Sequence, residues 1–137
     1  VLKNETDAEG NPLKIIRIPA PIPEYVLTTP EDWTNRTWGK RFSENEEPVL
    51  DDGTPMPEGE IIMQPAMSYI NYLVCNDVVI AQSYWREGKS EAIRQRDEEA
   101  MAVLAEAYPG RSIVPIYSMD LNIRGGGIHC ATKNIQK

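Results

Sequence analysis

The order of apolar segments along this chain predicts an α/β or α+β fold. Two apolar stretches, residues 68–75 and 78–81, flank an Asn-Asp turn and predict a β-hairpin. An amphipathic helical pattern follows, and a third apolar stretch, residues 112–116, comes after the helix. Strands that alternate with a helix in this way are typical of mixed α/β domains, in which the helix covers one face of a sheet.

The composition is that of one ordinary globular domain. The 137 residues are 41% hydrophobic and 26% charged. With 14 Lys and Arg against 21 Asp and Glu, the formal net charge is −7. This charge argues against a nucleic-acid partner, because phosphate-binding surfaces need clustered cations. No apolar run reaches the roughly 18 to 20 residues that a membrane-spanning helix needs, so we expect no membrane partner either.

The first half of the chain carries little regular pattern. Residues 14–18 are β-branched and apolar and predict a short strand, which ends at the prolines that follow. Residues 24–64 lack sustained periodicity and predict a long irregular insertion. The aromatic residues Trp33, Trp38 and Phe42 argue against disorder. We interpret this insertion as a surface loop held by its own aromatics, with an active-site lid as the alternative.

Asn71 is an unusual residue on the predicted hairpin. Alternation along the first strand places four residues on one face: Tyr69, Asn71, Leu73 and Cys75. A side-chain amide among apolar neighbours must find hydrogen-bond partners or cost about 1 to 3 kcal/mol. We therefore expect the Asn71 amide to be bonded within the fold.

A helix is predicted in the second half of the chain. It starts near Asp97, whose carboxylate can cap the free amides of the first turn, or earlier, near Ser90. Its apolar stripe has helical spacing and consists of Ala100, Val103, Leu104, Ala107 and Tyr108. Pro109 and Gly110 end the helix. In the strand that follows, Pro115 cannot donate to a ladder, which predicts that the strand lies at an edge or ends there.

The cysteine and histidine content limits the kinds of site that the chain can form. Cys75 and Cys130 are too few for a disulfide scaffold and lack the number and spacing of a structural zinc site, so we expect no metal. A reduced, cytoplasmic setting fits this usage. His129 is the only histidine, so chemistry that needs an imidazole must use this ring or one from elsewhere.

Three consecutive glycines, residues 125–127, precede Ile-His-Cys and form the most unusual local sequence in the chain. Glycine permits positive φ and lets backbone amides approach a ligand closely. A cysteine just beyond such a turn can face a cavity, where a cation or aimed amides would lower its pKa and activate it as a nucleophile. The residues favour a second interpretation equally, in which Cys130 is a buried structural cysteine beside a β-bulge. On extended backbone His129 and Cys130 would point to opposite faces, so we do not expect His129 to act as the base for Cys130. We expect it instead to brace the loop by hydrogen bonding.

The segment from Gly125 to Asn134, Gly-Gly-Gly-Ile-His-Cys-Ala-Thr-Lys-Asn, resembles the C-terminal signature of the agmatine deiminase and bacterial peptidylarginine deiminase family of the guanidine-modifying superfamily. Further segments that resemble this family are residues 4–8, 15–21, 68–72, 98–108 and 108–111. The resemblance covers most of the chain outside an insertion at residues 33–59.

This resemblance implies a fold and a chemistry. The chain, residues 1–137, would be the C-terminal part of a single catalytic domain and supply the last one and a half to two ββαβ units of a pentein-type α/β propeller. Cys130 would attack the guanidinium carbon, and ammonia would leave from a covalent intermediate that water then hydrolyses to the ureido product. The resemblance also implies that Asn71, Gly126 and Gly127 contact the substrate, and that Gly125 and His129 support the loop.

The rest of the active site is expected outside this chain. Family members use a His-x-Asp segment and further acids from earlier units, and no His-x-Asp occurs here. The acidic residues Asp51, Asp52, Glu58 and Glu60 are interpreted as solvated loop charge. An N-terminal remainder of the same enzyme is therefore the expected partner, a homo-oligomer is also compatible with the sequence, and no cofactor is expected.

Three functions stay open. The leading hypothesis is hydrolytic deimination of agmatine to N-carbamoylputrescine and ammonia, a step of putrescine biosynthesis. The second is deimination of peptidyl-arginine to citrulline, because Gly127 leads directly into Ile128 without the Asn that is common in agmatine deiminases. The third is a non-catalytic interaction module, in which the segment 24–64 binds a partner.

Overall fold

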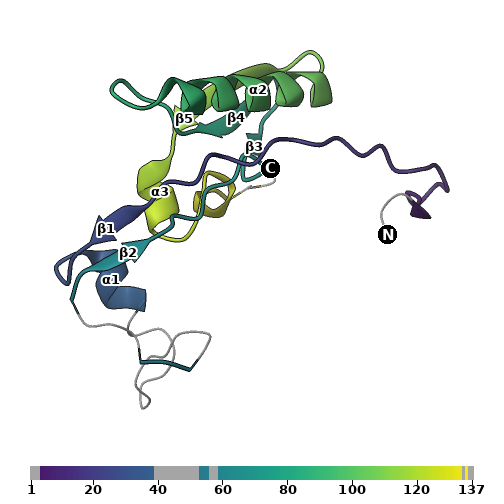
Figure 1. Cartoon of the computed structure of the whole chain (residues 1–137). Coiled ribbons are helices and arrows are strands. Elements are labelled where there is room, and N and C mark those ends of the chain that lie inside the picture. The colour runs from purple at the N-terminus through teal and green to yellow at the C-terminus, as the bar shows by residue number, and fades with distance from the viewer. Residues whose placement is uncertain (1–3, 39–52, 56–58, 134, 136–137) are drawn as a thin grey trace.

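The computed structural model describes residues 4–38, 53–55, 59–133 and 135 (Figure 1). These residues form two small sheets joined by loops and short helices, which confirms the prediction of a mixed α/β fold. The described part of the chain forms no closed barrel or propeller. Within that same part, no helix is both long enough and apolar enough to cross a bilayer.

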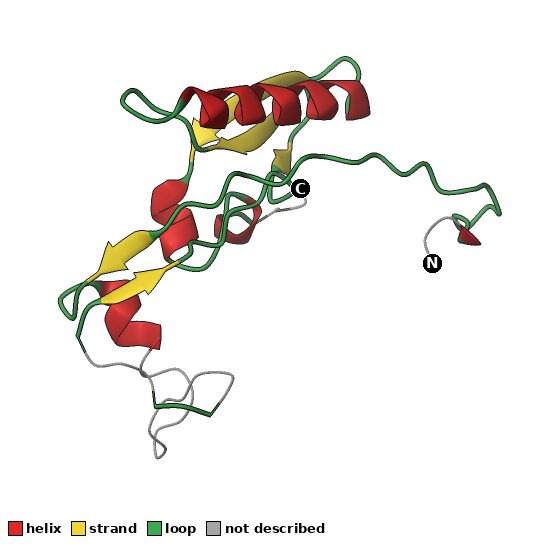
Figure 2. Ribbon diagram, in the orientation of Figure 1, coloured by secondary structure: helices red, strands yellow, loops and turns green. Residues whose placement is uncertain are grey.

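The larger sheet contains the predicted hairpin in shortened form and the strand that follows the helix, because residues 68–72 form a loop and not the first part of the expected strand. Its strands are β3 (Leu73–Val74), β4 (Val78–Ser83) and β5 (Ser112–Tyr117), in the order β3-β4-β5. β3 and β4 are antiparallel, whereas β4 and β5 are parallel and therefore need a crossover connection. Helix α2 (Glu91–Ala107) is that connection and lies along one face of the sheet (Figure 2). β5 is an edge strand, as Pro115 predicts.

Helix α2 begins at the earlier of the two predicted positions. The Ser90 hydroxyl accepts a hydrogen bond from the Ala92 amide at 3.3 Å and caps the helix, so the expectation that Asp97 is the cap is wrong. Asp97 instead lies inside the helix and is buried. Within the expected stripe, Ala100 and Leu104 are buried.

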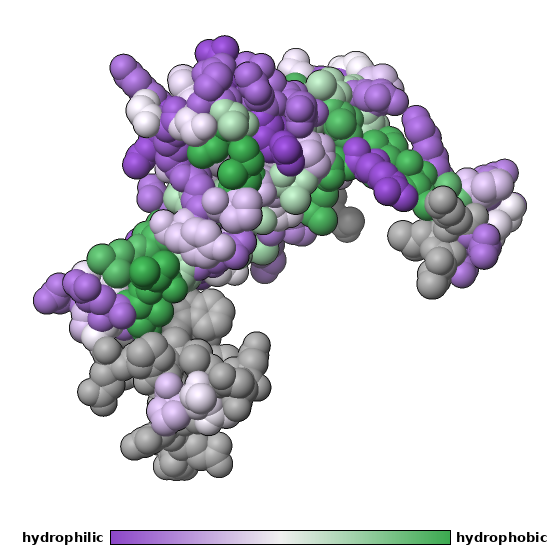
Figure 3. Space-filling model, viewed as in Figure 1, coloured by the Kyte–Doolittle hydropathy of each residue, from purple (hydrophilic) through white to green (hydrophobic). Residues whose placement is uncertain are grey.

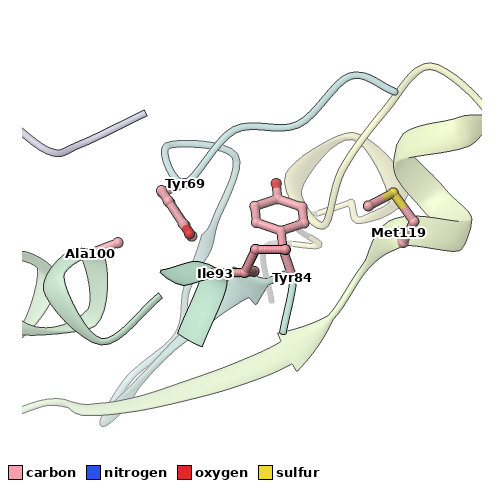
Figure 4. Packing of buried hydrophobic residues seen from close by; sticks show 5 residues of the cluster. All are labelled: Tyr69, Tyr84, Ile93, Ala100 and Met119. Carbon is pink, nitrogen blue, oxygen red and sulfur yellow. The ribbon is translucent and has the colours of Figure 1, made fainter. Parts of the chain in front are cut away.

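The core lies where α2, the end of β4 and the loop before β3 meet. Figure 4 shows the five side chains of its central cluster: Tyr69, Tyr84, Ile93, Ala100 and Met119. The Tyr69 and Tyr84 rings pack with their centroids 5.3 Å apart. Asp97 binds this cluster from the helix: its carboxylate accepts from the Tyr69 hydroxyl at 2.5 Å and from the Tyr84 and Trp85 amides at 2.9 and 2.8 Å. The loop that follows Tyr69 is therefore fixed to α2.

The second sheet corrects part of the prediction for residues 24–64. Strands β1 (Val26–Thr28) and β2 (Ile61–Met63) pair antiparallel, and helix α1 (Trp33–Trp38) follows β1. The insertion is therefore not irregular throughout, because its two ends pair with each other. Residues 39–52 and 56–58, with Phe42, Asp51, Asp52 and Glu58, lie outside the described residues.

The predicted strand at residues 14–18 is wrong. This segment is extended but pairs with no other strand in the described part of the chain (Figure 1). The end of this segment and the residues that follow it are held instead by packing of Ile18 and Ile22 against the core and by a hydrogen bond from Arg96 to the Ala20 carbonyl at 3.0 Å. Apolar side chains gather along this segment and over the β1–β2 sheet (Figure 3), and those that are exposed include Ile15, Ile16, Leu27 and Ile62.

Candidate functional site

Two loops far apart in the sequence meet at the candidate site. One is the loop from Tyr69 to Tyr72, and the other runs from α3 (Met119–Ile123) through the glycines to a short 3-10 helix, η2 (His129–Ala131). The first loop is fixed at both ends, because the Tyr69 hydroxyl bonds to Asp97 and the Tyr72 hydroxyl bonds to the Tyr108 hydroxyl at 2.7 Å. Asn71 lies between these two anchors, so its side chain has a fixed origin.

Asn71 and Cys130 contact each other directly. The Asn71 side-chain amide donates to the Cys130 sulfur at 3.0 Å, across 59 positions of sequence. The Asn71 side-chain oxygen accepts from the backbone amides of His129 at 2.8 Å and of Cys130 at 3.4 Å. These amides open η2 and have no partner inside that turn, so one side chain both caps the turn and contacts the thiol. The expectation that the Asn71 amide is bonded within the fold is confirmed.

The backbone at His129 and Cys130 is not extended, so the prediction that their side chains point to opposite faces does not hold. Hydrogen bonds from the Ala131 amide to the Gly127 carbonyl and from the Thr132 amide to the His129 carbonyl close a helical turn instead. His129 braces this turn through its main chain, since its amide donates to Asn71 and its carbonyl accepts from the Thr132 hydroxyl at 2.9 Å. The His129 side chain is exposed.

Each of the three glycines meets a different requirement. Gly125 has a φ of +87°, a region that favours glycine. At Gly126 an added Cβ would lie 3.2 Å from the Cys130 Cβ. At Gly127 it would lie 2.6 Å from the Gln82 Oε1 and 2.7 Å from the Asn71 Cγ, closer than real contacts allow. The absence of a side chain at residue 127 thus lets the loop pack against Asn71.

Cys130 faces an open hollow of about 280 Å³. The residues that line it are Leu121, Arg124, Gly125, Gly126, Gly127, Cys130 and Ala131. The alternative of a buried structural cysteine is therefore wrong, because the side chain is exposed beside this hollow. The structure brings Cys130, Asn71 and the three glycines together, while substrate contact by Asn71, Gly126 and Gly127 stays a prediction.

The surroundings of Cys130 favour its thiolate. The hydrogen bond from the Asn71 side chain is the largest cause that lowers the pKa of the Cys130 thiol, and the backbone amide of Gly127 adds to it. Both groups place a positive dipole end against the sulfur, which stabilises the charged form. The thiolate is the nucleophilic form of cysteine, so this arrangement raises the fraction of the thiol that is in the nucleophilic form.

We expect the substitution Asn71→Ala to raise the pH at which Cys130 becomes reactive. It removes the largest cause of the lowered pKa, so at neutral pH a smaller fraction of the thiol is ionised. The measurement is the rate of Cys130 alkylation by iodoacetamide from pH 5 to 10, in a Cys75→Ser background that leaves one thiol. Asn76→Ala, in the β3–β4 turn, serves as the control and leaves the profile unchanged. A profile that stays the same in Asn71→Ala would show that the amide does not act on the thiol.

Two buried residues of the site were missed by sequence reasoning. Gln82 and Asn122 are fully buried, and the Asn122 side-chain amide donates to the Gln82 Oε1 at 2.8 Å. The available signal for Gln82 was a polar residue that interrupts the apolar run of β4, and for Asn122 it was an amide between Leu121 and Ile123. Among the residues that the structure describes, no group of three His, Cys, Asp or Glu side chains could hold a metal ion.

Comparisons with known proteins identify relatives of the whole chain. Residues 1–135 match the sequence profile of the family described as Porphyromonas-type peptidyl-arginine deiminase. A Photobacterium profundum protein named "Putative agmatine deiminase" is 32% identical over 137 residues, which are 100% of this chain and 31% of that protein. An agmatine deiminase of Pseudomonas putida is 30% identical over 133 residues, 97% of this chain and 30% of that protein.

A solved structure agrees with the sequence relatives. The agmatine deiminase of Enterococcus faecalis, described as catalysing its reaction, matches with a TM-score of 0.56 and 25% identity over 93% of this chain and 28% of that chain. The chain spans less than a third of the length of the relatives that it matches.

Proposed function

The chain belongs to the family of Porphyromonas-type peptidyl-arginine deiminases, and on this premise we propose that it contributes the nucleophile to a guanidine deiminase that acts on agmatine. The products are N-carbamoylputrescine and ammonia. The observation that carries this proposal is the hydrogen bond from Asn71 to the sulfur of Cys130, on the wall of an open hollow.

The chemistry follows from the electrophile. A guanidinium is planar and cationic, so its carbon reacts only with a strong nucleophile such as a thiolate. The Cys130 sulfur bonds to this carbon, one nitrogen takes a proton and leaves as ammonia, and an amidino thioether remains. Water then adds to the same carbon, the C–S bond breaks, and the thiolate is restored as the ureido product leaves. Overall one water is consumed and one ammonia is released for each guanidinium.

Other groups must hold the cation and move protons. Carboxylates have to orient the guanidinium, and an acid has to protonate the departing nitrogen. We assign these tasks to residues outside this chain, because the chain covers only 30% of the agmatine deiminase of Pseudomonas putida. In this proposal the consecutive elements β3, β4, α2 and β5 are one ββαβ unit of a propeller that the remaining length completes.

Peptidyl-arginine is the second candidate substrate. The family description names it, and Gly127 is followed directly by Ile128. The same thiol would attack either substrate, so the two candidates differ in what binds the rest of the molecule.

The test incubates the chain, alone and joined to the remaining length found in its relatives, with agmatine and with an arginine-containing peptide. Ureido product is measured, and a haloacetamidine label is mapped to Cys130 or Cys75 by mass spectrometry. We expect product from agmatine with the joined protein, and labelling of Cys130 in preference to Cys75. Product from the peptide alone would assign the second substrate. If neither substrate gives product, the proposal of deiminase activity is rejected and a non-catalytic interaction module is favoured.

A further inference from the structure

Beneath the candidate site lies a buried network of side-chain amides that the proposed chemistry does not use. Asn122 and Gln82 are each 0% exposed, and Ser118 is 2% exposed. The Ser118 hydroxyl donates to the Asn122 Oδ1 at 3.0 Å, which fixes the orientation of the Asn122 amide group. The Gln82 Nε2 donates to the Ser68 carbonyl, so the network reaches the loop that carries Asn71. Burying a side-chain amide costs free energy unless hydrogen bonds compensate for the lost contacts with water. In this network each side-chain amide has hydrogen-bond partners within the protein.

Asn122 connects the two loops of the site. Its side-chain nitrogen carries two hydrogens and lies within hydrogen-bond distance of three oxygens, one of which is the Ala66 carbonyl at 3.0 Å. The main-chain carbonyl of Asn122 accepts from the Ala66 amide at 3.1 Å. The same nitrogen donates to the Gly126 carbonyl at 2.8 Å, within the glycine loop. One side chain thus holds the segment that leads to Asn71 and the segment that leads to Cys130.

The bond to Gly126 has a geometric consequence at the thiol. The Gly126 carbonyl and the Gly127 amide belong to one peptide group, which is planar and trans, so its C=O and N–H point in opposite directions. Because Asn122 holds the carbonyl on the buried side, the Gly127 N–H is directed to the other side, toward Cys130. The Gly127 amide is one of the groups that stabilise the Cys130 thiolate. Without an anchor, rotation of this group between two glycines would meet little steric resistance and could turn a carbonyl oxygen toward the sulfur.

We propose that Asn122, supported by Gln82 and Ser118, is a positioning residue that holds the Gly126–Gly127 peptide group with its N–H aimed at the Cys130 sulfur. The proposal deepens the proposed function and rests on it, since it concerns the reactivity of the thiol that attacks the guanidinium. Asn122 does not line the hollow and does not touch the reacting atoms.

The test is the pH profile of Cys130 alkylation in the full-length protein with Cys75→Ser. Asn122→Asp keeps the shape of the side chain but replaces the donor to the Gly126 carbonyl with an acceptor. We expect the profile to move to higher pH and the rate at neutral pH to fall several-fold, with kcat lowered and KM little changed. The matched control is Asn35→Asp, because the Asn35 amide also donates to two carbonyls, those of Thr28 at 3.2 Å and Gly59 at 2.9 Å, in the other sheet. This control leaves the profile unchanged.

A folded Asn122→Asp protein with an unchanged alkylation profile overturns the proposal. If this variant does not fold, the wild-type protein decides by NMR. The Gly127 amide proton is then expected to shift with the same midpoint as the Cys130 Cβ carbon, and a Gly127 amide that does not follow the thiol overturns the proposal. Alkylation needs no turnover, so the two proposals fail separately. An unchanged profile in an active enzyme refutes the role of Asn122 alone, whereas a shifted profile in a protein that makes no product refutes the deiminase.

Discussion

Replacing Cys130 with alanine is expected to abolish formation of the ureido product, with kcat lowered on the order of 10⁴-fold or more. The effect is this large because, in the proposed mechanism, the sulfur forms and breaks the covalent bond between protein and substrate. Of the two cysteines, only Cys130 receives a hydrogen bond from a side-chain amide and faces the glycine-lined hollow. The measurement is steady-state formation of ureido product from agmatine by the full-length protein.

The matched control is Cys75→Ala. Cys75 is also an exposed free thiol, but it lies in the turn between β3 and β4, where its amide bonds to the Val78 carbonyl at 2.8 Å. Its replacement should leave kcat within about twofold of the wild-type value, because surface substitutions away from special features change little. Full activity of a Cys130→Ala protein with intact fold would show that Cys130 is not the nucleophile. An equal loss of kcat in both variants would mean that replacing either cysteine destabilises the protein.

The elements of the second half of the chain could be predicted because they are long or bounded by strong signals. The stripe from Ala100 to Leu104 has helical period, and the turn at Asn76 and Asp77 separates two apolar runs. The β1–β2 sheet could not be predicted, since strands of three residues have no period to detect and their pairing spans more than 30 positions. The segment 14–18 has the composition of a strand, but a strand also needs a partner, and composition does not supply one.

The motif of the candidate site could be recognised from the sequence, but its geometry could not. The resemblance based on the glycines and Cys130 is confirmed by the family match. The pairing of Asn71 with Cys130 joins positions 59 residues apart, so only the folded chain displays it. The helical turn at His129 is capped by Asn71, which lies 58 positions away in the sequence. Local sequence alone therefore does not indicate this turn. Local sequence indicates which residues can react, while the buried amides that orient them come from distant elements.

The substitution with the largest expected effect on stability is Asp97→Ala. Asp97 is buried and accepts three hydrogen bonds, from the Tyr69 hydroxyl and from the Tyr84 and Trp85 amides. Hydrogen bonds to a charged group contribute about 1.5 to 3 kcal/mol each and are not additive, so we expect the free energy of unfolding to fall by about 3 kcal/mol or more. The measurement is the urea midpoint at pH 7. The neighbouring exposed residue provides the control, because Glu98→Ala removes only a surface ion pair with Arg94 and should cost about 0.5 kcal/mol or less.

The pH dependence of stability separates the loss of these hydrogen bonds from a mere packing defect. Burial, and then the hydrogen bond and charge of Asp97, raise the pKa of Tyr69 above its ordinary value of 10. A group whose pKa is raised by folding stabilises the protein below its unfolded pKa, and this contribution is lost as the pH rises above about 10. The wild-type free energy of unfolding should therefore decline above that pH, and the total decline should be smaller in Asp97→Ala, where burial and Tyr84 still act on Tyr69 but Asp97 does not. Equal total declines in the two proteins would mean that Asp97 does not hold the Tyr69 hydroxyl, and that the loop carrying Asn71 is fixed by packing instead.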